Sequence, residues 1–223
     1  MSKIVVLGAG IAGHTAAAHL RRKLGKEHEV LVVSPNRNYQ WVPSNIWVGI
    51  GRMKSKEVIF PLEPLYKRKG IGYKQAKAVS FHPEGDGSEH KPYILVEGVF
   101  GENLGKQEKV TYDYLINATG PKLAFDMTEG LVPETNKVYS VCTYDHAEKA
   151  SEALHKLIDQ LKKSDKKAKI LIGTGHAKAT CQGAAFEYIL NVEKELQKFG
   201  VRDKVEIAWI SNEYELGDFG MDG

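Results

Sequence analysis

Short apolar runs alternate with glycines and amphipathic stretches at the start of the chain. Residues 4–7 are apolar, glycines follow, residues 15–24 are amphipathic with helical spacing, and residues 30–33 are apolar again. This succession fits a strand, a crossover helix and a parallel strand, because such a unit needs about 30 residues. The pattern therefore predicts an α/β architecture.

The middle of the chain follows a different pattern. Residues 39–51 are aromatic and glycine-rich without periodicity, which predicts an ordered loop, whereas residues 73–81 fit a strand. Polar turns and short apolar runs over 83–105, such as 93–96, predict a β-meander. Residues 110–118 are predicted to form one further strand, which runs into the tripeptide Ala-Thr-Gly.

A second strand–glycine–helix–strand succession begins about 165 residues after the first. Asp145 with Glu148 three residues later resembles a capping box, and apolar residues then recur at helical spacing. An apolar run at 169–172 precedes glycines, a helix predicted over 184–199 and a strand predicted over 205–210. The plan of the first succession is therefore repeated.

Composition narrows the class of protein. Hydrophobic residues make up 42% and charged residues 26% of the 223 residues, which is ordinary for a globular chain. The 31 basic residues exceed the 28 acidic ones by only three, which gives little support to nucleic-acid binding. With no apolar run near the roughly 20 residues of a membrane span, no signal peptide and only two cysteines, we expect a cytoplasmic chain without a disulfide scaffold.

The first glycine group has the spacing Gly8-x-Gly10-x-x-Gly13 between a strand and a helix. In a dinucleotide site the first glycine permits the turn, the second lets the backbone approach the pyrophosphate, and the third lets the helix pack closely. The alternative is a glycine-rich turn that binds nothing. An acid for the ribose hydroxyls is missing at the end of the second strand, so Ser34 or Asn36 would replace it, which disfavours NAD and remains compatible with FAD.

We therefore predict two Rossmann-like dinucleotide-binding domains. Residues 1–125 form the first, with the β-meander as an insertion, residues 126–164 form a connecting segment and helix, and residues 165–223 begin a second domain that is incomplete. A Rossmann-type half normally needs further strands to bury both faces of its sheet. Either the last unit is a short edge element or the chain is one piece of a longer protein.

Both cysteines precede predicted helices. Cys142 lies just before the helix near Asp145, and Cys181 ends a glycine-containing loop that also holds His176 and Lys178. A helix N-terminus and nearby positive charge favour a thiolate, so these residues are candidate catalytic groups. A buried, inert cysteine is the alternative, and a bridge between the two is left open because the sequence does not give their separation. Their wide spacing excludes a redox pair of close cysteines.

The second glycine loop departs from the nucleotide-binding pattern. Gly173 and Gly175 match, but Lys178 stands in the place of the third glycine. The following strand ends at Ser211 without the ribose-binding acid, although Glu213 is close. These departures disfavour NAD(P)H in this half of the chain.

Over essentially the whole chain, the combined motifs resemble the sulfide:quinone oxidoreductases and, more distantly, the flavocytochrome c sulfide dehydrogenase flavoproteins. The segments that carry the resemblance are Val5-Val6-Leu7-Gly8-Ala9-Gly10, Trp41-Val42-Pro43-Ser44-Asn45, Trp47-Val48-Gly49, Tyr112-Asp113-Tyr114-Leu115, Ala118-Thr119-Gly120-Pro121-Lys122, Cys142-Thr143-Tyr144-Asp145-His146-Ala147-Glu148 and Cys181-x-Gly183-x-Ala185-x-Glu187-Tyr188.

The resemblance implies FAD in the first domain and a catalytic cysteine in the second. It implies that Cys181 carries sulfide sulfur beside the flavin with a partner cysteine from a C-terminal half, while Cys142 assists or joins the flavin covalently. Two electrons would pass from sulfide to FAD and then to quinone, without a metal. The FAD-binding residues implied by the motifs and the resemblance are Gly8, Gly10, Ile11, Ala12, Gly13, Ser34, Asn36, Pro43, Ser44, Asn45, Ala78, Val79, Ala118, Thr119 and Gly120.

The resemblance also sets expectations about partners and location. Family members are longer than this chain and contact the membrane from the cytoplasmic side through C-terminal amphipathic helices. We expect this chain by itself to be soluble, and a homo-oligomer is left open. Two rival functions remain, a type II NADH dehydrogenase-like flavoprotein and an inactive nucleotide-binding fragment. His14 has no explanation at the level of sequence.

Overall fold

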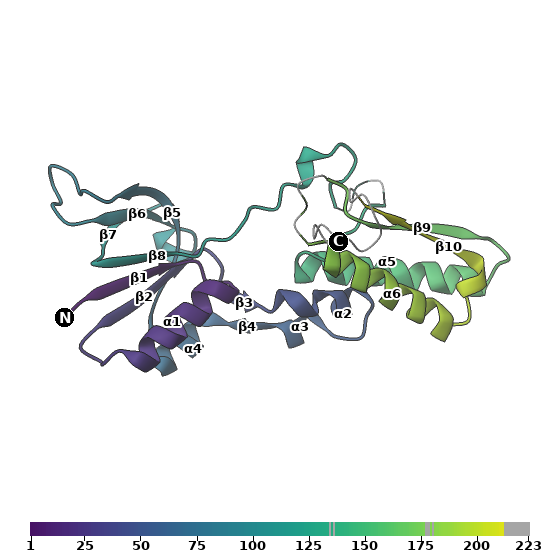
Figure 1. The fold of residues 1–223 in the computed structure, drawn as a ribbon, viewed down its shortest axis with the longest axis horizontal. Helices are drawn as coiled ribbons and strands as arrows, with labels where there is room; N and C mark the ends of the chain where they lie inside the picture. The colour runs from purple at the N-terminus through teal and green to yellow at the C-terminus, as the bar shows by residue number, and fades with distance from the viewer. Residues whose placement is uncertain (134, 136, 177–178, 180, 212–223) are drawn as a thin grey trace, which may run out of the picture. The chain divides into compact units, whose positions relative to one another are not determined.

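The structure, a computed structural model, describes residues 1–133, 135, 137–176, 179 and 181–211 (Figure 1). Contacts divide the chain into two compact units, which we describe separately. Unit 1 contains Met1–Gln40 and Ile59–Lys122, and unit 2 contains Trp41–Val58 and the chain from Leu123 onward. The segment Trp41–Val58 thus packs with the later part of the chain, although it comes from the range 1–125.

Unit 1 is built on a six-stranded sheet in the order β7-β6-β5-β2-β1-β8 (Figure 1). The strands β5, β2, β1 and β8 run parallel, and β6 and β7 continue the sheet from β5 as an antiparallel meander. Their bounds are β1 Lys3–Leu7, β2 Glu29–Ser34, β5 Gly72–His82, β6 Tyr93–Gly98, β7 Gln107–Thr111 and β8 Tyr114–Asn117. The other elements of unit 1 are α1 Ile11–Lys23, β3 Asn38–Gln40, β4 Ile59–Pro61, α4 Leu62–Lys69 and η2 Gly101–Asn103.

The apolar runs predicted as strands become the middle of this sheet because both of their faces are covered. Val6 and Val32 contribute to a core that includes Ala17 of α1 and Tyr66 of α4. On the opposite face, neighbouring residues of the same strands pack with Ile94 of the meander. Since side chains alternate across a strand, burial on both faces requires an unbroken apolar run. The predicted α/β fold and the meander are confirmed.

The single strand predicted over 110–118 is two strands in the structure. The chain turns at Tyr112 and Asp113, between β7 and β8. Asp113 fixes this turn, because its backbone N–H donates to the carbonyl of Lys3 (2.9 Å) and its Oδ2 accepts from the N–H of Lys3 (2.7 Å). The prediction failed because residues on both sides of the turn are strand-forming, and only the pairing with β1 shows where the chain changes partners.

Unit 2 holds the second strand–helix–strand succession. Helices α5 and α6 pack with the parallel pair β9 and β10, whose register joins Ala168 to Val205. The bounds are η3 Phe125–Met127, α5 Tyr144–Lys162, β9 Ala168–Gly173, α6 Gln182–Lys198, η4 Arg202–Lys204 and β10 Val205–Ile210. The predicted capping box does not form: the N-cap of α5 is Thr143, without a side-chain capping bond, and Asp145 lies in the first turn.

Residues 39–51, predicted as a loop, contain the end of β3, the turn η1 Val42–Ser44 and the helix α2 Asn45–Gly49, and α3 Ser55–Val58 follows. Helix α2 is too short to show a hydrophobic period and is held by its neighbours. The hydroxyl of Tyr188 on α6 donates to the carbonyl of Gly49 (3.0 Å), and a Cβ on Gly49 would lie 2.8 Å from Cγ1 of Val141. Burial of the Tyr188 ring raises the pKa of its hydroxyl.

None of the helices in the described part of the chain is both long and apolar enough to cross a membrane.

The structure explains His14, which lies on α1 among aromatic rings. Its Nδ1 is 3.1 Å from the hydroxyl of Tyr66, and its ring centroid is 5.0 Å from that of Tyr39 and 5.8 Å from that of Phe60. Burial, with a smaller contribution from the charge of Lys69, lowers the pKa of His14 below 6.5. A neutral His14 therefore helps to hold α1 against α4 and the antiparallel pair β3–β4.

We expect acid to weaken this packing. Unfolded His14 takes up a proton at higher pH than folded His14, so its contribution to stability is complete above 6.5 and declines as the pH falls below that value. Between about pH 7 and about pH 5, the melting temperature of the wild type should fall more steeply than that of His14→Gln. His19→Gln, an exposed position on the same helix, should keep the wild-type slope. Equal slopes for all three proteins would contradict this role of His14.

Candidate functional site

The first glycine turn joins β1 to α1 in unit 1, and packing requires two of its three glycines. Gly8 has φ +95°, and a Cβ there would lie 2.2 Å from the carbonyl oxygen of Ala118. A Cβ on Gly13 would lie 2.0 Å from the carbonyl oxygen of Gly8. The N–H of Gly8 also donates to the carbonyl of Val33 (2.8 Å). These contacts explain the first and third glycines by backbone crowding alone.

Gly10 is different, because neither packing nor conformation requires it. Its φ is −73°, and a Cβ built on it meets no atom within 4 Å. Gly10, Ile11 and Ala12 are exposed at the start of α1, which has no side-chain cap and no acidic residue in its first turn. The outward-facing N–H groups of a helix start bind anions, and a glycine there allows a ligand to approach the backbone closely. The geometry fits a pyrophosphate cradle.

The Ala-Thr-Gly segment lies beside this cradle, directly after β8. The N–H of Ala118 donates to the carbonyl of Leu7 (2.8 Å), which places Ala118 against Gly8 and Gly13. Asn117 Oδ1 accepts from both the N–H and the hydroxyl of Thr119, at 3.2 and 2.9 Å, and Gly120 has φ +72°. The structure therefore brings together two motifs that are more than a hundred residues apart in the sequence.

Ser34 and Asn36, the two candidates for binding the ribose at the end of β2, differ in their exposure. Ser34 is 1% exposed, and its hydroxyl oxygen accepts from the N–H of Asn36 (3.3 Å). Asn36 is exposed, while its carbonyl accepts from the hydroxyl of Tyr73 (2.5 Å). Only the Asn36 side chain is accessible of the two, so it is the better candidate for binding a ribose.

Ala78 and Val79 lie on β5 beyond its pairing with β2, which ends at Gln75. Ala78 pairs with Val96, and the register then shifts before Ser80, so Val79 is a bulge residue with 46% of its surface exposed. β-Bulges occur preferentially next to functional sites, where they redirect the strand. This is compatible with the predicted backbone contacts to an adenosine but does not by itself indicate one.

Pro43, Ser44 and Asn45 belong to unit 2, at the junction of η1 and α2. Pro43 is exposed, Ser44 is half-buried and Asn45 is 1% exposed. Both amide atoms of Asn45 lack a hydrogen-bond partner among the described residues. An unpaired buried polar group costs about 1–3 kcal/mol. At 1% exposure this amide is closed to a ligand in the conformation described.

Both cysteines are free and exposed, also in unit 2. Cys142 lies directly before Thr143, the N-cap of α5, and its N–H donates to the hydroxyl of Ser140 (3.0 Å). Cys181 is itself the N-cap of α6. Neither cysteine is buried, as the alternative required, and no bridge joins them. Lys178, expected to add positive charge near Cys181, lies outside the described residues.

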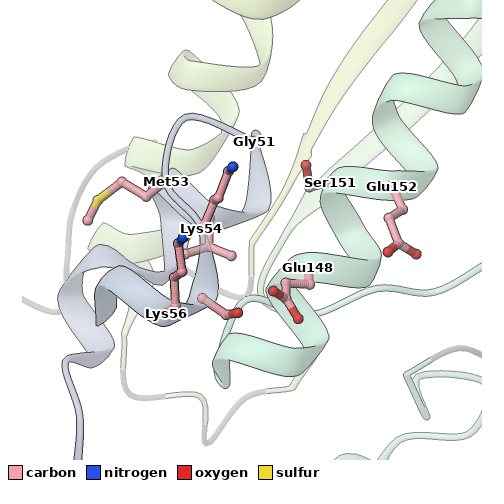
Figure 2. A pocket seen from close by; sticks show the side chains of 9 residues that line it. Gly51, Met53, Lys54, Lys56, Glu148, Ser151 and Glu152 are labelled. Carbon is pink, nitrogen blue, oxygen red and sulfur yellow. The ribbon is translucent and has the colours of Figure 1, made fainter. Parts of the chain in front are cut away.

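The structure also shows an open depression that the sequence did not indicate, between α5 and the segment joining α2 to α3 (Figure 2). It has a volume of about 450 Å³. Glu148 and Glu152 on α5 line one side and Lys54 and Lys56 line the other (Figure 2). Because two carboxylates face two ammonium groups, the walls are electrically balanced, and we assign no ligand to this depression.

Known proteins resemble most or all of this chain. A sulfide-quinone reductase of Aquifex aeolicus is 30% identical over 220 residues, which are 99% of this chain and 45% of that protein. A type II NADH:quinone oxidoreductase of Haemophilus influenzae is 27% identical over 162 residues, 71% of this chain and 34% of that protein. The solved structure of the Aquifex aeolicus sulfide:quinone oxidoreductase matches with a TM-score of 0.79 at 27% identity, covering 100% of this chain and 46% of that one.

These comparisons confirm the resemblance to sulfide:quinone oxidoreductases and the Rossmann-like fold. The chain spans less than half the length of each of these relatives. The family model described as pyridine nucleotide-disulphide oxidoreductase matches residues 2–186. Since that match covers most of the sequence, the chain belongs to the pyridine nucleotide-disulphide oxidoreductase family.

Proposed function

We propose that this chain is the FAD-binding part of a sulfide:quinone oxidoreductase, in which sulfide delivers two electrons to FAD and a quinone removes them. Family membership implies a flavin cofactor. The observation that carries the proposal is the open cradle at Gly10, because the neighbouring Gly8 and Gly13 are explained by packing and Gly10 is not. A dinucleotide pyrophosphate is the chemistry that uses such a position.

Residues of unit 1 would bind the nucleotide part of FAD. The N–H groups of Gly10, Ile11 and Ala12 would bind the pyrophosphate, with Gly8 and Gly13 shaping the turn, and Asn36 would bind a ribose hydroxyl in preference to Ser34. Ala118, Thr119 and Gly120 would border the cradle, and Ala78 and Val79 would contact the adenosine through their backbone. The resemblance assigns Pro43, Ser44 and Asn45 of unit 2 to the lining of the isoalloxazine ring.

The two thiols would perform the sulfur chemistry. Bound FAD supplies the capacity to accept two electrons at once and to pass them to a quinone. Cys181 is the N-cap of α6, so its sulfur lies at the helix end that favours negative charge. Forming a sulfur–sulfur bond between this thiolate and sulfide would release two electrons and a proton, and bound FAD would accept the electrons. Cys142 lies one residue before the N-cap of α5 and would assist. Both cysteine residues are exposed, so a small anion such as hydrosulfide would be able to reach them.

A reductive titration tests this function. The chain is loaded with FAD under anaerobic conditions and titrated with sulfide, and the visible flavin absorbance should bleach. Cys181→Ser should slow bleaching by about 100-fold or more, because an oxygen cannot carry the sulfur, while FAD affinity stays at the wild-type value. Cys142→Ser should have a smaller effect.

The alternatives give different results in the same titration. Bleaching by NADH but not by sulfide would indicate a type II NADH dehydrogenase-like flavoprotein. A preparation that binds no FAD would indicate an inactive fragment. Unchanged bleaching rates in both cysteine variants would contradict the role proposed for the thiols.

A further inference from the structure

The second glycine turn, which follows β9, repeats the backbone crowding of the first. Gly173 has φ +159°, and a Cβ there would lie 1.7 Å from the carbonyl oxygen of Ile210 at the end of β10. The N–H of Thr174 donates to the same carbonyl (3.0 Å). A glycine at 173 therefore allows the chain after β9 to pass close to the end of β10, just as Gly8 allows the chain after β1 to pass close to the backbone that follows β8.

The two turns differ at the second glycine. Around Gly10 the space that a Cβ would fill is empty, whereas a Cβ on Gly175 would lie 2.0 Å from Cδ1 of Leu131 and 3.4 Å from its Cγ. The Leu131 side chain thus covers the backbone that a pyrophosphate has to approach. The space that is open in the first turn is filled by an apolar group in the second.

Leu131 is held over Gly175 by its own short turn. Its N–H donates to the carbonyl of Thr128 (3.1 Å), and the hydroxyl of Thr128 donates to the carbonyl of Gly175 (3.3 Å). Within the glycine loop, the hydroxyl of Thr174 donates to the side-chain oxygen of Gln182 (2.7 Å). Gln182 is the first residue of α6 and is 8% exposed. Among the described residues, Leu131 and Thr128 therefore lie against Gly175, and the hydroxyl of Thr174 is paired with Gln182.

We propose that Leu131 is a specificity-determining residue that closes the second glycine turn to pyridine nucleotides. A pyrophosphate on Gly175 would have to displace the leucine side chain or be buried against it, and a phosphate desolvated by hydrocarbon without hydrogen bonds is strongly disfavoured. Electrons then enter from a donor other than NAD(P)H. This deepens the proposed function and rests on it for one point only, that FAD occupies the first turn.

The test measures NADH binding by fluorescence titration of the chain saturated with FAD, so that the first turn is already filled. Leu131→Ala removes the three side-chain atoms nearest to Gly175 and should bind NADH at least about tenfold more tightly than the wild type. Val132→Ala removes a 43% exposed neighbour and should bind as the wild type does. Leu131→Met, which keeps the volume, should also match the wild type.

The proposal would be overturned if Leu131→Ala and the wild type bound NADH with the same affinity. If Leu131→Ala does not fold, Leu131→Val gives the same direction with a smaller change. If the wild type fails to bind FAD, the proposed cofactor site is wrong. The NADH titrations are then repeated with Gly10→Ala in every protein, which obstructs the first turn and still tests Leu131.

Discussion

Replacing Gly8 by alanine is expected to lower the free energy of unfolding by about 4 kcal/mol. The residue has φ +95°, which strains any residue with a Cβ, and that Cβ would lie 2.2 Å from the carbonyl oxygen of Ala118. The obstacle is backbone in the sheet, not the flexible end of a side chain, so relief requires β8 to move away from β1. Urea unfolding followed by circular dichroism measures the loss.

Gly10→Ala is the matched control, two residues away in the same turn. Its φ is ordinary and the space for a Cβ is empty, so the free energy of unfolding of the protein without FAD should change by about 1 kcal/mol or less. FAD affinity should nevertheless fall about tenfold or more, because the new methyl group lies where the pyrophosphate approaches. If Gly10→Ala binds FAD as the wild type does, the cradle is not the cofactor site. If Gly8→Ala is as stable as Gly10→Ala, the crowding argument fails.

Arg52→Ala is expected to lower the free energy of unfolding by about 3 kcal/mol, because it leaves a carboxylate buried without its main counter-charge. The partner, Glu195 on α6, has a side chain only 2% exposed and lies 2.5 Å from Arg52 Nε. Its other oxygen is 3.7 Å from Nζ of Lys198, which is too distant to replace the lost hydrogen bond. This pair fastens the segment that carries Pro43–Asn45 to the helix that begins beside Cys181.

Two further variants test whether the burial of Glu195, and not ion pairing as such, makes the Arg52 contact stabilising. Glu195→Gln should cost less than Arg52→Ala, because a neutral amide needs no counter-charge and its oxygen still accepts from Arg52. Lys169→Ala breaks an ion pair with Glu206 in the same unit whose side chains are 56% and 65% exposed, and should cost less than about 1 kcal/mol. Urea unfolding of the three variants under one set of conditions compares them. An Arg52→Ala loss no larger than that of Lys169→Ala would show that the pair contributes nothing beyond a surface contact.

Much of unit 1 could be predicted from the sequence because its signals are local. Glycine spacing indicated the first turn, since a positive φ and a close helix–strand approach leave few residue types other than glycine. The apolar runs indicated buried parallel strands. The short helix α2 could not be predicted, because it is stabilised by Tyr188 and Val141, which are distant in the sequence, and not by its own periodicity.

The sequence by itself determined the succession of strands and helices, the FAD-like first turn and the identity of the two thiols, because each depends on residue type and on spacing over a few positions. Only the tertiary structure decided that Asn36 is accessible while Ser34 is buried, that both thiols are exposed, and that Leu131 covers Gly175 while Gly10 is left open. The accessibility of a residue depends on which other residues pack around it. Here those residues come from distant parts of the chain, and nothing in the sequence indicates that they are in contact.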